Sequence, residues 1–187
     1  MKKIIALTLA LLLMLSITAC SGKPEIASAA PSDNSGNAGK TSASDPYGRS
    51  AYDAVVSRNE ITLVTVLATW STPCEGMIST LQEVSGMRKV GVVALISDAV
   101  DESSYAVDDE TMEYAKELMA AKNADFTIVA PDKDLFVNFC APTEFYPTSY
   151  IVDAEGKVIS SPIIAAADSE SLTEALSAAL ESASNAG

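Results

Sequence analysis

The sequence predicts a single α/β domain. Two runs of β-branched and apolar residues, 61–68 and 91–97, have the length and composition of strands that are covered on both faces. Stretches with helical spacing of apolar residues follow these runs, and a strand, a turn and a hairpin partner come near the C-terminus. The resulting order, βαβαβαββα without an internal repeat, is typical of one α/β domain.

The elements follow one another from the start of the domain near Pro46. Pro73 suits the first turn of a helix, where its missing N–H costs nothing. Asp132 is a plausible cap for a short helix, and Gly156 ends the turn before the hairpin partner. The expected helices cover 47–58, 73–89, 110–122, 132–139 and 169–183, and the expected strands cover 61–68, 91–97, 126–130, 148–152 and 157–160.

Residues 1–20 have the features of a secretory signal. Two lysines are followed by an apolar run that is too short for a permanent membrane helix, and small residues precede Cys20. The end of this segment, Ile-Thr-Ala-Cys, resembles the bacterial lipobox, in which the cysteine is lipidated. That resemblance implies a lipid on Cys20 and a protein anchored to the extracytoplasmic face of the cell membrane. The alternative is that the apolar run is a buried helix of the mature protein.

The segment 21–45 is dominated by small and polar residues, and we expect a flexible tether there, with the folded domain spanning 46–187. From Cys20 onward the chain has 10 basic and 25 acidic residues, a net charge of −15. So negative a protein repels phosphate backbones, which argues against a nucleic-acid partner.

The side-chain inventory restricts the chemistry. The chain has no histidine, which removes Ser-His and Cys-His catalysis and most catalytic zinc sites. Its three cysteines are far apart in sequence, so we expect no metal and no cofactor. The acidic loop 98–110 has enough carboxylates for Ca²⁺ but lacks EF-hand spacing, and a solvated loop is the simpler interpretation.

Three segments carry landmarks of a known family. In the first, a strand runs into the start of a helix: ITLVTVLATWSTPCEGM. In the second, a proline precedes a strand and a turn: TEFYPTSYIVDAEGKVIS. The third, roughly residues 99–131, adds a helix and a strand between them. Together they resemble the thioredoxin superfamily and, more narrowly, the TlpA/ResA-like thiol-disulfide reductases. The resemblance implies a thioredoxin-like fold, a central mixed sheet flanked by helices, with the TlpA-type helix–strand insertion.

The resemblance also implies a binding face. Pro147 would follow a cis peptide bond and face the active-site helix, although an ordinary trans proline at the start of a strand is the alternative. In relatives this loop offers backbone groups to an extended substrate. The substrate-binding residues implied for this chain are Trp70, Pro73, Tyr146, Pro147 and Thr148, and the implied partners are exported proteins or peptides that carry thiols or disulfides, or a client bound without redox chemistry.

The chain departs from the family at the position of the catalytic nucleophile. Ser71 stands where redox-active relatives have the first cysteine of Cys-x-x-Cys, and a serine hydroxyl does not form a mixed disulfide. Cys74 occupies the second cysteine position. Met77 and Ser79 replace a glutamate and a proline of the TlpA-like pattern, so three landmarks of the motif are lost.

The remaining thiols leave three possibilities open. Cys74 and Cys140 form a disulfide if their Cα atoms come within about 7 Å. Alternatively, both are buried, inert thiols, or Cys74 acts alone as a monothiol. The sequence therefore favours a membrane-anchored member of the thiol-disulfide oxidoreductase lineage with atypical or impaired dithiol chemistry, and leaves open whether it is an enzyme. The alternative is a redox-silent module that binds a client peptide or partner protein.

Overall fold

The computed structural model describes residues 47–186. The signal predicted for 1–20, with Cys20, and the tether predicted for 21–45 lie outside the described residues. The strands are β1 (Ile61–Leu67), β2 (Val90–Ile96), β3 (Thr127–Val129), β4 (Thr148–Asp153) and β5 (Ile163–Ile164). The helices are α1 (Arg49–Val56), α2 (Thr72–Ser85), α3 (Asp109–Ala121), α4 (Lys133–Leu135) and α5 (Ser169–Ala186), with a 3-10 turn η1 (Ser97–Ala99) and a π-helical turn η2 (Phe136–Cys140).

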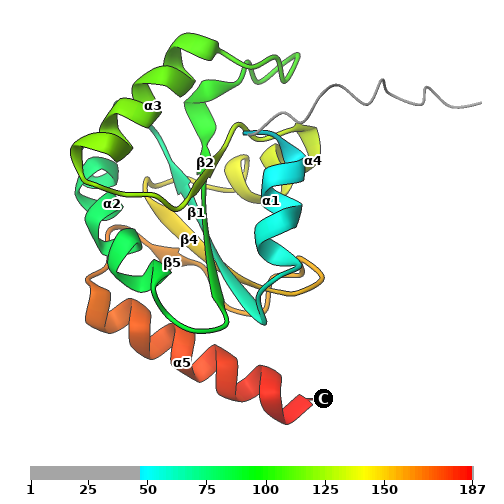
Figure 1. The fold of residues 1–187 in the computed structure, drawn as a ribbon. Coiled ribbons are helices and arrows are strands. Elements are labelled where there is room, and N and C mark those ends of the chain that lie inside the picture. The colour runs from blue at the N-terminus through cyan, green and yellow to red at the C-terminus, as the bar shows by residue number, and fades with distance from the viewer. Residues whose placement is uncertain (1–46, 187) are drawn as a thin grey trace, which may run out of the picture. The chain divides into compact units, whose positions relative to one another are not determined.

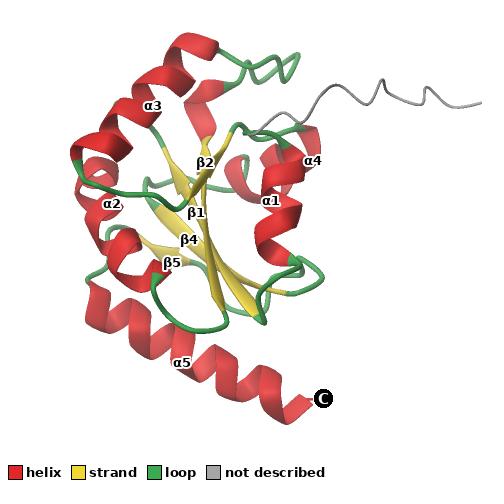
Figure 2. Ribbon diagram, in the orientation of Figure 1, coloured by secondary structure: helices red, strands yellow, loops and turns green. Residues whose placement is uncertain are grey.

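The strands form one mixed sheet in the order β3-β2-β1-β4-β5 (Figure 2). The central strand β1 pairs in parallel with β2 and antiparallel with β4, while β3 extends the sheet in parallel and β5 antiparallel. All seven residues of β1 and of β2 are buried, as expected of apolar runs covered on both faces. This topology is the thioredoxin-like fold, and α3 and β3 form the helix–strand insertion that the sequence predicted.

Helices cover both faces of the sheet, and each face has its own core. Figure 1 shows α2 and α3 on one side and α1 and α4 on the other. Along β1 the side chains alternate between the two cores, because successive residues of a strand point to opposite faces. Ile61, Leu63 and Leu67 belong to the core under α2, α3 and α5, whereas Val64 and Val66 belong to the core under α1 and η2.

The terminal helix α5 was predicted from leucines spaced four apart. Leu172 and Leu176 are fully buried in the core, and Leu180 packs against it from a partly buried position. The carboxylate of Asp168 accepts a hydrogen bond from the Ser171 amide at the start of this helix. Across residues 47–186 none of the helices combines the length and the apolar character needed to cross a membrane.

Two predicted elements differ from the structure by more than three residues at one end. Helix α2 ends at Ser85 instead of about residue 89, because Gly86 follows it and favours termination. The hairpin partner predicted at 157–160 is reduced to one bridge, between Val152 and Val158, and the strand forms later, at Ile163–Ile164. Pro162 lies between them and has no N–H to donate to a ladder.

Candidate functional site

The site begins where β1 runs into α2. Ser71 is the N-cap residue of α2 with an extended backbone, and Pro73 lies in the first turn, as the sequence predicted. The carbonyl of Ser71 accepts the amide of Glu75 at 3.1 Å, which closes the first helical turn. This geometry directs Cys74 toward the core and leaves Trp70 on the surface, where 70% of its area is exposed.

The segment before the helix is held by Asp98. The amide of Thr69 donates to both carboxylate oxygens of Asp98, at 3.1 and 3.0 Å, and the Thr69 hydroxyl donates to one of them at 2.7 Å. Asp98 follows β2, the parallel neighbour of β1, so the carboxyl ends of the two strands meet at this edge of the sheet. Three hydrogen bonds to one carboxylate fix the backbone that presents Trp70.

Cys74 is buried and keeps its proton at neutral pH. Its exposed fraction is 3%, and the Ala68 amide donates to its sulfur at 3.5 Å. Burial raises the pKa of the Cys74 thiol above its ordinary value, and the charge of Asp98 acts in the same direction. Hydrogen bonds from the Ser71 side chain and the Ala68 amide oppose this rise without cancelling it. Because the thiolate is the nucleophile, Cys74 is a poor one.

Cys140 lies in the other core. It ends the π-helical turn η2, is 3% exposed, and packs on the face of the sheet that α1 covers, whereas Cys74 packs on the face that α2 covers. Both thiols are free. The pairing of Cys74 with Cys140 that the sequence left open is therefore not formed, because the sheet separates the two cores. Burial raises the pKa of Cys140 to about 12.

The proline loop lies beside the helix start. The Tyr146–Pro147 peptide is cis, as the resemblance implied. The hydroxyl of Thr148, the first residue of β4, donates to the Phe145 carbonyl at 2.7 Å, and the Ala165 amide donates to the Pro147 carbonyl at 3.0 Å. Neither the N–H nor the carbonyl of Tyr146 has a hydrogen-bond partner within residues 47–186.

Exposed aromatic side chains surround this peptide. The rings of Trp70 and Tyr146 meet edge to face, with centroids 5.7 Å apart and an interplanar angle of 74°. Phe145 is 61% exposed on the same loop. It lines a groove of about 140 Å³ together with Ile164, which is 60% exposed on β5. We refer to Trp70, Phe145 and Tyr146 as the aromatic face.

The structure brings most of the predicted site residues together. Trp70, Ser71, Pro73 and Cys74 lie at the start of α2, and the Trp70–Tyr146 contact joins them to the loop of Tyr146, Pro147 and Thr148. Cys140 is separated from them, and Cys20 lies outside the described residues. Met77, where the resemblance implied a glutamate, is 1% exposed and fills the core.

Two residues of this site were not predicted from the sequence. Asp98 was placed only in an acidic loop, although its position directly after a buried parallel strand was the signal that it meets the end of β1. Phe145 carried no signal beyond its proximity to Pro147. Because exposed apolar residues are common on protein surfaces, the sequence did not show whether Phe145 is buried or exposed.

The acidic loop uses its carboxylates to organise its own backbone. Asp101 accepts hydrogen bonds from Ser103 and Ser104, which lower the pKa of its carboxyl to about 2. Asp108 caps α3 through the amides of Glu110 and Thr111. In the part of the chain that the structure describes, no group of three or more Cys, Asp or Glu side chains is placed to hold a metal ion.

The chain is similar to several solved structures at low sequence identity. No protein-family model and no curated protein matches this chain. Among solved structures, StoA from Bacillus subtilis shares 18% identity over 63% of this chain and 82% of its own, with a TM-score of 0.46. A thioredoxin-family thiol:disulfide interchange protein from Chlorobium tepidum shares 20% identity over 63% and 77%, with a TM-score of 0.45.

A thioredoxin-related protein from Neisseria meningitidis serogroup B shares 16% identity over 66% of this chain and 87% of its own, with a TM-score of 0.48. Likenesses of this size assign no activity.

Proposed function

We propose that this protein is an extracytoplasmic, thioredoxin-like binding protein of the thiol-disulfide oxidoreductase lineage that performs no dithiol exchange of its own. Its site holds an extended segment of an exported client against the aromatic face. One observation carries the proposal: both thiols are buried on opposite faces of the sheet, while the binding half of the site is exposed.

The absence of dithiol exchange rests on the positions of the thiols. Exchange needs an accessible thiolate and a second thiol within reach to resolve the mixed disulfide. Ser71 occupies the accessible position at the helix N-terminus, and Cys74 below it is protonated and 3% exposed. Cys140 is too far inside the other core to resolve anything formed at Cys74.

Binding rests on the free backbone of the loop. The N–H and carbonyl of Tyr146, both without partners within residues 47–186, suit the backbone of an extended peptide, as in β-strand addition. Trp70 and Phe145 offer large exposed apolar surfaces on which the client's side chains pack. Tryptophan and tyrosine are also the residues that most often dominate binding energy at interfaces.

The location is also a proposal. A lipid on Cys20 would hold the domain at the outer face of the membrane, where exported clients pass. A Cys20→Ala variant should then appear in the soluble extracytoplasmic fraction, while the unchanged chain stays with the membrane. If both fractionate identically, the anchor through Cys20 is wrong.

Trp70 provides a direct test of binding, because it is the only tryptophan of the chain. Its exposed indole should shift its emission to shorter wavelengths when a client covers it. We would titrate the full chain with an unfolded polypeptide that lacks tryptophan and whose cysteines are permanently alkylated. A saturable shift that Tyr146→Ala weakens and Tyr114→Ala, on α3, leaves unchanged is the expected result. No shift, or equal shifts in both variants, would contradict the proposal.

A second candidate is Cys74 acting as a monothiol, favoured by the hydrogen bonds of Ser71 and Ala68 to its sulfur. In that case glutathione disulfide would leave a mixed disulfide on Cys74 that mass spectrometry detects in the native protein. An unmodified Cys74 after prolonged incubation would remove this candidate.

A further inference from the structure

A groove of about 140 Å³ adjoins the aromatic face, between the loop of Pro147 and β5. Phe145 belongs to both, so the groove continues the surface that the client is proposed to cover. Its other lining residues are Pro142, Thr143, Glu144, Thr148, Tyr150, Pro162 and Ile164. The volume lies below the range of small-molecule sites and is closer to that of one long side chain.

The lining side chains have no free hydrogen-bond donor. The hydroxyls of Thr143, Thr148 and Tyr150 all form hydrogen bonds within the protein, at distances from 2.7 to 3.4 Å. The two prolines of the groove have no N–H at all. A negatively charged side chain in the groove would therefore find no side-chain donor to compensate for its lost hydration.

Glu144 is the charged residue among those that line the groove, and its side chain is exposed. Within residues 47–186 its carboxylate takes part in no ion pair and accepts no hydrogen bond. An ionised carboxylate is an acceptor only, with two oxygens that a cation can approach. The groove thus combines apolar walls with one carboxylate whose acceptor capacity is unused.

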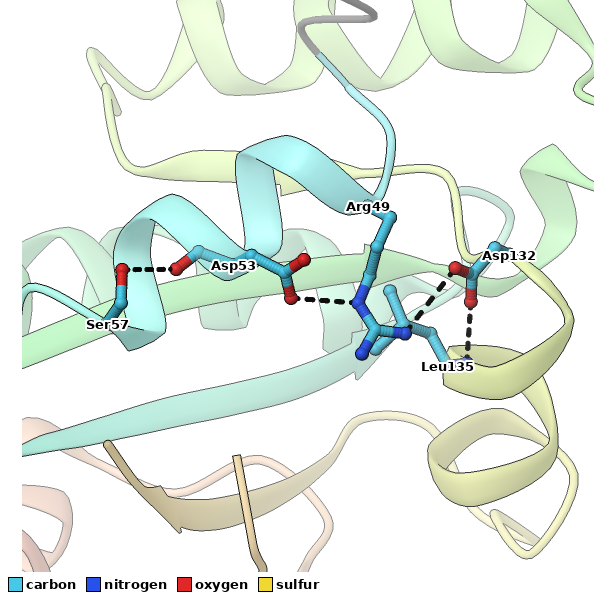
Figure 3. Close-up of polar contacts among 5 residues, drawn as sticks. All are labelled: Arg49, Asp53, Ser57, Asp132 and Leu135. Atoms are coloured by element: carbon cyan, nitrogen blue, oxygen red, sulfur yellow. Dashed lines mark hydrogen bonds and ion pairs between the residues drawn. The ribbon is translucent and has the colours of Figure 1, made fainter. Parts of the chain in front are cut away.

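Several other carboxylates of the domain already have a basic partner. Figure 3 shows Arg49 between two of them, 2.8 Å from Asp53 and 3.5 Å from Asp132. Three lysines form ion pairs with Glu60, Glu75 and Glu113. Because none of the described basic side chains reaches Glu144, residues 47–186 supply no counter-charge to the groove.

We propose that this groove takes a basic side chain, lysine or arginine, of the extended client, an inference that rests on the function proposed for the aromatic face. The alkyl stem packs on the exposed side chains of Phe145 and Ile164, and the charged head lies at Glu144. Residues of an extended segment are about 3.3 Å apart, so a client paired with the Tyr146 peptide reaches the groove within its next residues. The net charge of −15 from Cys20 onward also attracts a basic segment at long range.

The test compares two short peptides of serine, threonine and valine that differ only in the central residue. One has lysine there, and the other has Nε-acetyl-lysine, which keeps the stem and loses the charge. A fluorophore on each peptide reports binding to the full chain by anisotropy. The lysine peptide should bind roughly threefold more tightly, the size expected of an exposed ion pair. This advantage should shrink at high salt, because salt screens exposed charges.

Glu144→Gln keeps the shape of the side chain and removes its charge. This variant should bind the lysine peptide roughly threefold more weakly and bring the two peptides to equal affinity. Glu83→Gln, at an exposed position near the end of α2, changes the net charge equally and should preserve the advantage of the lysine peptide.

The outcomes separate this inference from the function on which it rests. If both peptides bind the unchanged chain with equal affinity, or if Glu144→Gln and Glu83→Gln act alike, the basic groove is wrong while client binding at the aromatic face stands. If neither peptide binds, or if Tyr146→Ala leaves their binding unchanged, the aromatic face is not the binding site and the basic groove fails with it.

Discussion

The two halves of the site differ in what they expose to solvent. At the start of α2, the motif half has a serine, Ser71, at the helix N-cap and a buried, protonated thiol on Cys74. Across from it, the loop half has a cis Pro147, a Tyr146 peptide without a partner in residues 47–186, and exposed aromatic rings. The reactive groups of the first half are therefore buried, whereas the backbone and aromatic groups of the second are accessible.

The two halves are held in place by different groups, and neither depends on a thiol at position 71. Asp98 and the cap of α2 hold the motif half in place through backbone hydrogen bonds that need no cysteine at position 71. The loop half depends on backbone and aromatic groups, which are equally independent of a thiol. Under the proposed function, the loop half can therefore bind a client without a reactive thiol in the motif half.

The largest expected effect is a gain of disulfide-reducing activity in the Ser71→Cys variant. The side chain at this position already reaches the Cys74 thiol, and a thiol at a helix N-terminus ionises readily. We expect insulin reduction with dithiothreitol to rise from background by at least roughly 100-fold. Adding Cys74→Ala should remove the resolving thiol and leave a trapped mixed disulfide. Failure of Ser71→Cys to form a disulfide with Cys74 would contradict the arrangement of this half.

A loss of binding is expected from Trp70→Ala. Since Trp70 is 70% exposed, stability should change by no more than about 0.5 kcal/mol. Affinity for an unfolded, alkylated client carrying its own fluorophore should fall at least roughly tenfold, as for aromatic hot spots. Anisotropy of the labelled client measures it, with Tyr114→Ala as the control. An unchanged affinity would show that the aromatic face is not the binding half.

The buried thiol of Cys140 should make stability depend on alkaline pH. Its pKa is raised from 9.0 to about 12, so the unfolded chain loses this proton first as pH rises, and the stabilisation is present below about 9 and lost toward 12. Between pH 8 and 10.5 the unfolding free energy should fall by about 2 kcal/mol more in the unchanged chain than in Cys140→Ala. Urea unfolding at both pH values measures this difference. If the unfolding free energy fell equally with pH in both proteins, Cys140 would ionise in the folded protein as readily as in the unfolded chain.

The smallest effect is expected from Cys74→Ala. Loss of the buried sulfur should lower the unfolding free energy by about 1 kcal/mol, because a small void forms and the Ala68 amide loses its acceptor. Client binding, followed through Trp70 emission, should stay the same. Weaker binding in this variant would mean that the motif half still takes part in recognition.

Much of this arrangement followed from the sequence. The apolar runs fixed β1 and β2, and the residues around Pro73 and Pro147 predicted where α2 begins and where the loop meets it. The position of Cys140 did not follow, because the face of the sheet that a helix covers depends on the path of the chain and not on the helix's own pattern.

A count of reactive thiols in the protein purified without reductant tests whether both thiols are buried and unpaired. Peptide mapping by mass after alkylation, in native and unfolded samples and with or without prior reduction, assigns Cys74 and Cys140 separately. We expect both thiols to react slowly when the protein is native, to react fully on unfolding without reduction, and to carry no glutathione after exposure to its disulfide. Labelling that requires reduction, or a glutathione adduct on native Cys74, would show instead that the thiols take part in redox chemistry.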